Sequence, residues 1–194
     1  MTPYEYALGL ISILMSLALA DIVVSFHRLI RSRAVVHWDG GRILVAAALV
    51  MLEIIRMWFA QWTGKDVAIA VTFGVYLGEF LQILLLVLLA YASLPDDVGE
   101  QCDLKDFYEK NRRYFWLVFS AYQATYVLLW LTVFGGTQAS VGGPVTAVDW
   151  FRMLGPLAVY LLLAFARVRW LDYAAPTLVI VFYLLRYWNQ SLAT

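Results

Sequence analysis

The chain has 194 residues, of which 63% are hydrophobic and 14% are charged. Soluble domains are nearer half apolar and a quarter charged, so this composition indicates an integral membrane protein in contact with the lipid bilayer. The 14 basic and 14 acidic residues balance, which excludes the basic surface expected of a nucleic-acid-binding protein. A single cysteine, Cys102, excludes an intrachain disulfide and a multi-cysteine metal cage.

Six apolar segments follow one another along the chain. A helix of about 20 apolar residues spans the hydrocarbon core of a bilayer, and these segments reach or approach that length. They predict an all-α, six-helix transmembrane bundle that forms one domain over residues 1–194, with spans at about 6–26, 43–62, 67–92, 114–134, 150–166 and 171–187. The last two spans are separated by residues 167–170 alone, which requires a very tight turn.

Basic residues are concentrated in the connections after the first, third and fifth spans, and the largest of these connections is residues 93–113. Ten of the 14 basic residues lie there, namely Arg28, Arg31, Arg33, Arg42, Lys105, Lys110, Arg112, Arg113, Arg167 and Arg169. Because cytoplasmic loops carry an excess of Lys and Arg, this distribution predicts both termini on the outer side of an inner or plasma membrane.

The first apolar segment has an alternative interpretation as a cleaved signal peptide, because residues 18–20 read Ala-Leu-Ala. The residues before it include Glu5 and no Lys or Arg, and residues 22–26 continue the apolar run. Both features favour a retained membrane helix.

Several boundaries are marked by local signals. Pro95 ends the third helix, and the acidic residues of segment 103–106 indicate the start of another. The stretch that begins there either lies along the membrane interface or extends straight into the fourth span. Residues 135–146 are rich in Gly, Ser and Thr and predict a coil, with a re-entrant loop as the alternative. Residues 146–149 predict a helix start, and Pro156 predicts a kink.

Charged and amide side chains interrupt the first four apolar segments. They are Asp21, Glu53, Arg56, Glu79, Gln82 and Gln123. An ionised group at mid-bilayer costs several kcal/mol, so such groups are usually buried, paired or functional. A helical rise of ~1.5 Å per residue places these residues at overlapping depths, and we therefore predict a shared buried polar cluster. Arg56 either bonds Glu53 on its own helix or reaches Asp21 or Glu79.

The third segment has two distinct faces. Glu79 and Gln82 lie on a polar face, whereas Gly74 and Gly78 lie on another. Small residues four positions apart permit close approach of a second helix. We therefore expect tight packing at these glycines. Together with a small-residue stripe on the first segment, at Gly9, Ser12, Ser16 and Ala20, they predict a homo-oligomer.

These features favour a small channel or transporter for protons or small cations. Asp21, Glu53, Glu79 and Gln82 would line the path, and Arg56 would be a counter-charge. The first alternative is a non-catalytic membrane subunit or effector that acts through self-association or through a cytoplasmic or membrane protein partner. In that case the buried charges only hold the bundle together.

The second alternative is an intramembrane lipid-modifying enzyme. His27 and His37 are the only histidines, which is too few for a histidine-box metal site, and neither is plainly close to a serine that it could activate. We therefore expect a non-enzymatic protein without a metal or other cofactor. The basic segment with Arg28, Arg31 and Arg33 predicts contact with anionic lipid headgroups or with a cytoplasmic partner.

Overall fold

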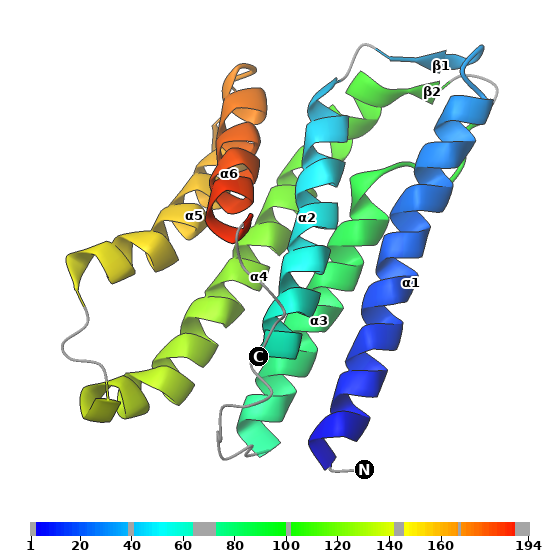
Figure 1. Cartoon of the computed structure of the whole chain (residues 1–194). Helices are drawn as coiled ribbons and strands as arrows, with labels where there is room; N and C mark the ends of the chain where they lie inside the picture. The colour runs from blue at the N-terminus through cyan, green and yellow to red at the C-terminus, as the bar shows by residue number, and fades with distance from the viewer. Residues whose placement is uncertain are drawn as a thin grey trace.

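The computed structural model describes residues 3–38, 41–63, 73–99, 102–141, 146–166 and 168–188. Within these ranges the chain forms six α-helices and one pair of very short strands (Figure 1). In chain order the elements are α1 (Pro3–Arg31), β1 (Val36–His37), α2 (Gly41–Thr63), α3 (Phe73–Ser93), β2 (Cys102–Asp103), α4 (Leu104–Val141), α5 (Ala147–Phe165) and α6 (Leu171–Tyr187). Apart from the strand pair, the predicted all-α class is confirmed, and residues 67–72 of the predicted third span lie outside the described ranges.

Within the described residues, four helices are long and apolar enough to cross a membrane, over Gly9–Arg31, Gly41–Gln61, Gly74–Ser93 and Leu104–Thr132. The apolar stretches of α5 and α6 are shorter, at Met153–Phe165 and Leu171–Leu185. The 17 residues of α6 extend about 25 Å at ~1.5 Å per residue, somewhat less than the ~30 Å hydrocarbon core. The chain is therefore an α-helical protein with membrane character, and a count of six spans depends on α5 and α6.

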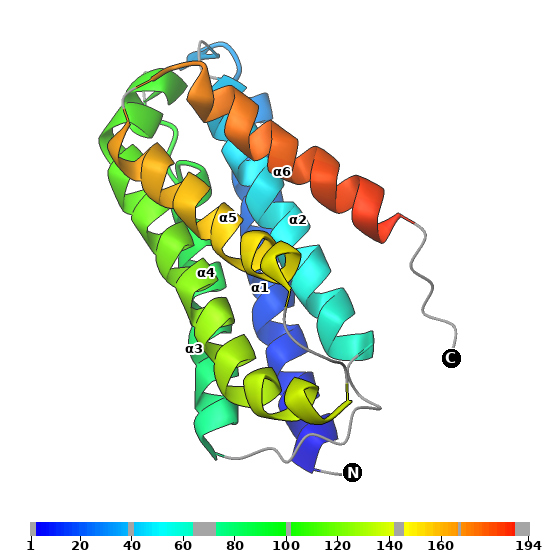
Figure 2. The same cartoon turned by 90° about the vertical axis from the view of Figure 1, so that its left-hand side faces the viewer.

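The helices pack as a bundle with a hairpin on one side. In the bundle, α3 contacts α1, α2 and α4, while in the hairpin α5 packs against α4 and α6 against α2. Figures 1 and 2 show α5 and α6 joined at one end and diverging toward the other, with α6 running beside α2. One face of α2 is therefore covered by α4 and α6, while α5 packs on α4 and α6.

The predicted start of α4 is confirmed. The Asp103 carboxylate accepts hydrogen bonds from the backbone N–H groups of Lys105 (2.8 Å) and Asp106 (3.2 Å), which is the geometry of a helix N-cap. From there one continuous helix runs into the fourth span. Leu104 and Tyr108 are buried in the protein core, so the stretch packs on the bundle as an extension of the fourth span.

The far end of α4 differs from the sequence-based expectation. Residues 135–141, predicted as coil or a re-entrant loop, continue α4 to Val141. A glycine inside a helix costs only about 1 kcal/mol relative to alanine, so an established helix can continue past the two glycines at 135–136. Residues 142–145 lie outside the described ranges. α5 begins immediately after Thr146, as predicted, and changes direction along its length, with Pro156 in its interior (Figure 1).

The connections after α1 and α3 are fastened to each other. β1 pairs in parallel with β2, and the Cys102 amide donates to the Val35 carbonyl at 3.1 Å. Arg28 Nη1 donates to the Asp96 carbonyl at 2.9 Å, which ties α1 to the loop after α3. The α5–α6 connection lies at the same end of the molecule (Figure 1). The three basic connections thus share one end, as the orientation argument requires.

Candidate functional site

A buried ion pair lies on α2. Glu53 has no exposed surface, and the Nε of Arg56 donates to its Oε2 at 2.8 Å. A spacing of three residues puts two side chains on one face of a helix, so this pair is formed within a single element. Of the predicted alternatives for Arg56, the bond to Glu53 is the one that the structure shows.

Tyrosine side chains from the neighbouring helices surround the pair. The Tyr122 hydroxyl accepts a hydrogen bond from Arg56 Nη2 at 3.2 Å and donates one to Glu53 Oε2 at 3.3 Å. The Arg56 Cζ lies 5.8 Å from the centre of the Tyr126 ring and 5.3 Å from that of Tyr183. These are cation–π distances, so the guanidinium has partners on α2, α4 and α6.

Tyr160, on α5, completes the wall of the site and has no exposed surface. Its ring centre lies 4.3 Å from that of Phe119 and 5.8 Å from that of Trp116, on which it stacks. Its hydroxyl lies next to that of Tyr183, on α6, which in turn lies next to the Glu53 carboxylate. Trp116 Nε1 in turn donates to the Tyr108 hydroxyl at 3.0 Å. Aromatic side chains therefore lead from the ion pair toward the basic end of the bundle.

Two oxygen atoms of this site make no hydrogen bond of ordinary geometry among the described residues, although the Tyr183 hydroxyl lies near both residues. They are Oε1 of Glu53 and the hydroxyl oxygen of Tyr160. Gln82 Nε2 and Ser25 Oγ are in the same condition elsewhere in the bundle. Leaving a buried polar group unsatisfied costs about 1–3 kcal/mol. Oε1 of Glu53 is therefore the atom of the Glu53–Arg56 pair that can accept a further hydrogen bond or a proton.

A second ionic cluster lies nearer the basic end and was missed by sequence reasoning. Asp172, in the first turn of α6, accepts from Arg112 Nε at 3.1 Å and lies 3.5 Å from Arg42 Nη1. Arg42 Nη2 also donates to Glu109 Oε1 at 3.1 Å. The exposed fractions of the Asp172, Arg42 and Arg112 side chains are 3%, 7% and 11%. The signal in the sequence was an acid in the first turn of a helix, with one basic residue at the start of α2 and another further along α4.

This cluster corrects the interpretation of two arginines. Arg42 and Arg112 were expected as orientation signals in connecting loops, but they lie on α2 and α4 and are largely buried. Arg112 also donates to the Ala166 carbonyl at the end of α5. Their charges join the α5–α6 turn to the bundle. The cavity beside Arg112 and Tyr108 has a volume of about 10 Å³, enough for roughly one water molecule.

The other predicted acids lie apart from the ion pair. Asp21 is half-buried on α1, where Asp96 and Arg28 are its charged neighbours. Glu79 is half-buried on α3. In the part of the chain that the structure describes, no hydrogen bond or ion pair joins Asp21 or Glu79 to Glu53. The structure thus brings Glu53 and Arg56 together and leaves Asp21 and Glu79 outside the predicted cluster.

The two predicted amides are buried separately. Gln123 Nε2 donates to the Met153 carbonyl at 3.3 Å, which fastens α4 to α5. Gln82 is 2% exposed and has an unpaired Nε2. Gln123 therefore holds two helices together, and no described contact links either amide to Glu53.

Gly78 and Gly74 differ in their surroundings. A Cβ added to Gly78 would lie 2.5 Å from Leu129 Cδ2 on α4, whereas one added to Gly74 would meet nothing within 4 Å. The predicted close approach is therefore present at Gly78, and it joins α3 to α4 within one chain. Gly74 faces open space.

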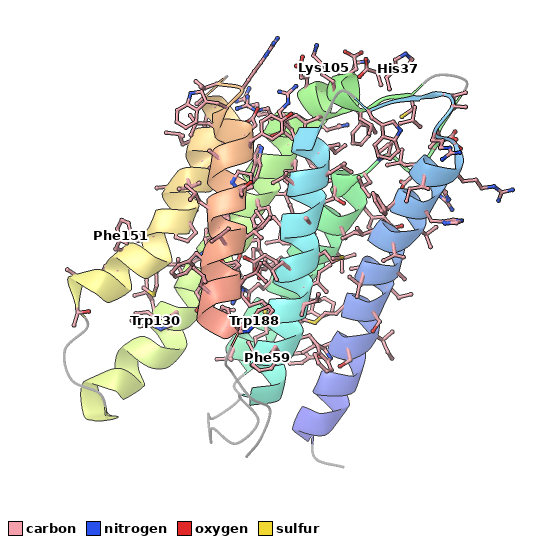
Figure 3. The ribbon with its side chains drawn as sticks, turned by 45° about the horizontal axis from the view of Figure 1, so that its top comes forward. His37, Phe59, Lys105, Trp130, Phe151 and Trp188 are labelled. Carbon is pink, nitrogen blue, oxygen red and sulfur yellow. The ribbon has the colours of Figure 1, made fainter. Side chains whose placement is uncertain are left out.

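Two basic side chains at the end of the bundle that carries the three basic connections are exposed. Arg31 and Arg33 are exposed at the end of α1 and just after it. Figure 3 shows His37 and Lys105 at this same end, while Trp130, Phe151 and Trp188 lie well away from it. Arg28, by contrast, already contacts the Asp96 carbonyl.

The described residues contain no group of three or more His, Cys, Asp or Glu side chains placed to hold a metal ion. Comparison with protein-family models, curated proteins and solved structures finds no match for the chain.

Proposed function

We propose that this chain is a small multi-pass membrane transport protein for protons or small cations, without enzymatic activity, and that the transported charge binds at Glu53. In this proposal all six helices cross an inner or plasma membrane, and both termini lie on the outer side. The shared end of the three basic connections supports that orientation, because Lys and Arg are enriched in cytoplasmic loops.

The observation that carries the proposal is the state of the Glu53 carboxylate. It lies near the middle of α2, has no exposed surface, and keeps one oxygen without a partner among the described residues. Ionisable groups inside a membrane are costly and mark ion pathways and proton relays. A carboxylate that served only to hold helices together would be expected to have both oxygens bonded.

The arrangement also identifies the counter-charge. Arg56 balances Glu53 while the site is empty of transported charge, and its contacts with three tyrosine side chains hold it in place. Asp21 and Glu79 are not needed for this role, because each lies apart from the pair.

Transport is tested in liposomes that contain the purified protein and a pH- or cation-sensitive dye. Wild type should show flux, and Glu53→Gln should reduce it to the level of protein-free liposomes. Glu79→Gln is the matched control, because it makes the same change on α3, and its flux should persist. Flux that survives Glu53→Gln, or the absence of any flux by the wild-type protein, would contradict the proposal.

A second candidate is a non-catalytic membrane subunit that acts through a protein partner. Two observations favour it. The charges of Glu53 and Arg56 cancel within the pair, and the connections after α1 and α3 are joined by the β1–β2 pair. Absence of flux, together with reduced thermal stability of Glu53→Gln, would support this candidate.

We further propose that the chain self-associates through α1, where Gly9 and Ser16 are exposed and a Cβ on Gly9 would meet nothing within 4 Å. Small residues on a membrane helix permit close packing of a second helix. Crosslinking in membranes should yield dimers or larger species, and a yield of monomer alone would contradict self-association.

A further inference from the structure

We infer that an anionic phospholipid binds where α4 and α5 pack together, on the surface formed by Arg113, Leu117, Leu161 and Phe165, which we call the α4–α5 seam. Arg113 binds the headgroup phosphate, and the two leucines contact an acyl chain. This inference goes beyond transport and requires only that α4 and α5 lie in the bilayer. It is carried by the contact between Arg113 and Phe165, by the exposure of both side chains, and by the position of Arg113 along α4.

Arg112 and Arg113 are neighbours in the sequence but lie in different environments. Successive positions on an α-helix are about 100° apart around its axis. Arg112 is directed into the protein, where it donates to Asp172 Oδ1 at 3.1 Å and to the Ala166 carbonyl. Arg113 is exposed, and no hydrogen bond or ion pair joins it to another described residue. The two arginines therefore have separate roles, and Arg113 is free to bind a ligand.

Phe165 positions the guanidinium of Arg113 without using its donors. The Arg113 Cζ lies over the Phe165 ring, 5.2 Å from the ring centre, which is a cation–π distance. The ring itself is 60% exposed, so this contact is formed on the outer surface of the bundle. Stacking on a ring leaves the N–H groups of a guanidinium available, and arginine binds phosphate through two parallel N–H donors.

The depth of Arg113 matches the headgroup region of a bilayer. The apolar stretch of α4, Leu104–Thr132, has 29 residues, whereas about 20 are enough to cross the hydrocarbon core. Counting about 20 residues back from Thr132 reaches Arg113. Trp170 is exposed in the α5–α6 turn at the same end (Figure 1), and tryptophan and arginine side chains are typical of the interface between lipid and water.

Apolar side chains continue from Arg113 in the direction of the hydrocarbon core. Leu117 lies one turn further along α4 than Arg113, and Leu161 lies one turn before Phe165 on α5. They are 37% and 40% exposed. Residues four apart share a helix face, and α4 and α5 pack together in opposite directions (Figure 2). Both leucines therefore lie on the side of the Arg113–Phe165 contact that is further from the headgroups.

The charge of the seam favours an anionic lipid. Glu109, one turn before Arg113 on α4, accepts from Arg42 Nη2 at 3.1 Å, so its charge is already balanced. Arg169, in the α5–α6 turn, is exposed and adds a second positive charge at this end. Exposed basic side chains attract the anionic headgroups of the cytoplasmic leaflet. A free phosphate ion would satisfy Arg113 alone, whereas a phospholipid satisfies Arg113 and also covers the leucines below it.

The test identifies the lipid that touches the seam. The full chain, with the photocrosslinker p-benzoylphenylalanine in place of Leu117, is reconstituted in vesicles of equal parts phosphatidylglycerol and phosphatidylcholine with identical acyl chains. After illumination, mass spectrometry of the attached lipid gives the ratio of the two. Phosphatidylglycerol should be enriched about fivefold. A second protein with the crosslinker in place of Leu128, which is 60% exposed further along α4, should report the composition of the vesicle.

Two charge variants of the Leu117-substituted protein locate the headgroup contact. Arg113→Gln should return the lipid ratio to about that of the vesicle, since the phosphate loses its donor. Arg31→Gln is the matched control, because it removes the same exposed charge from α1, which packs against α2 and α3, and it should keep the enrichment. Both proteins are checked for folding by circular dichroism and gel filtration.

Four results would overturn the inference. They are equal lipid ratios at the two crosslinker positions, enrichment that survives Arg113→Gln, an equal loss in Arg31→Gln, and attachment mainly to a second copy of the chain. If the protein with the crosslinker in place of Leu117 does not fold, the same measurement is made with the crosslinker in place of Leu161. Flux is measured separately, so the lipid site and the transport function can each fail alone.

Discussion

Arg56 and Glu53 form an ion pair of 2.8 Å within a single helix, with 11% and 0% of their side-chain surfaces exposed. A buried ion pair adds little net stability, because the cost of removing both charges from water offsets their attraction. Loss of one partner is different, since it leaves the other charge buried and unpaired. The pair is therefore sensitive to single substitutions, which suits a site whose protonation has structural consequences.

Arg56→Met should destabilise the protein by about 3–5 kcal/mol, because Glu53 would be left without its counter-charge. The double variant Glu53→Gln/Arg56→Met should lose less, since no charge then remains buried. Equilibrium unfolding in detergent micelles measures both. If the stability lost in the double variant equals the sum of the losses in Arg56→Met and Glu53→Gln, the two residues are not coupled.

Asp172→Asn should loosen the α5–α6 turn, because Arg42 and Arg112 would lose the carboxylate that they share at 3.5 and 3.1 Å. Loss of a buried ionic partner costs about 3–5 kcal/mol. The matched control is Asp106→Asn, which breaks an exposed pair with Lys110 and should cost at most about 0.5 kcal/mol. Hydrogen exchange across residues 168–175 measures the loosening. Equal exchange in both variants would show that Asp172 does not hold the turn.

Gly78→Ala should destabilise the packing of α3 on α4 by about 1–3 kcal/mol, because the new Cβ requires Leu129 to move. Gly74→Ala should be neutral or stabilise by up to about 1 kcal/mol, since it fills open space and alanine favours a helix. Thermal unfolding of the two variants, measured side by side, checks the difference. A Gly78→Ala protein as stable as Gly74→Ala would contradict the close approach.

Asp103 should make the start of α4 sensitive to acid. Hydrogen bonds from the backbone N–H groups of Asp106 and Lys105 hold the pKa of Asp103 below its ordinary value. A lowered folded pKa means that the stabilisation is fully present above the unfolded pKa, about 3.9, and is lost as the pH falls through the folded value. Exchange of the Lys105 and Asp106 amides, corrected for its intrinsic pH dependence, should increase over that range.

Asp103→Asn provides the control for this prediction. Asparagine is an equally good N-cap acceptor but does not titrate. The same amides should therefore show no acid-dependent loss of protection in the variant. Identical pH profiles in the two proteins would show that the Asp103 carboxylate is not responsible.

Much of the fold follows from local features of the sequence. Apolar length alone locates the helices that could cross a membrane, and Asp103 and Pro95 mark boundaries through capping and steric rules that act over a few residues. The Glu53–Arg56 pair was among the predicted alternatives because a spacing of three residues places the partners on one helix face. These signals all act within a single element.

The rest of the site depends on contacts between elements. Tyr122, Tyr160 and Tyr183 lie on three different helices, and a tyrosine in an apolar helix gives no indication of which neighbour it faces. Asp172 pairs with arginines at least 60 positions away, and those arginines matched the pattern of an orientation signal. Depth along a helix predicted that Asp21 and Glu79 could meet Glu53, but rotation about the helix axis decides which side chains meet.

Infrared difference spectroscopy of the reconstituted protein tests the central claim most directly. Lowering the pH across the range in which flux occurs should produce the C=O band of a buried, protonated carboxylic acid in wild type. That band should be absent from Glu53→Gln and present in Glu79→Gln. A wild-type protein in which Glu53 stays ionised throughout this range, or a band that persists in Glu53→Gln, would contradict the assignment of Glu53 as the transport site.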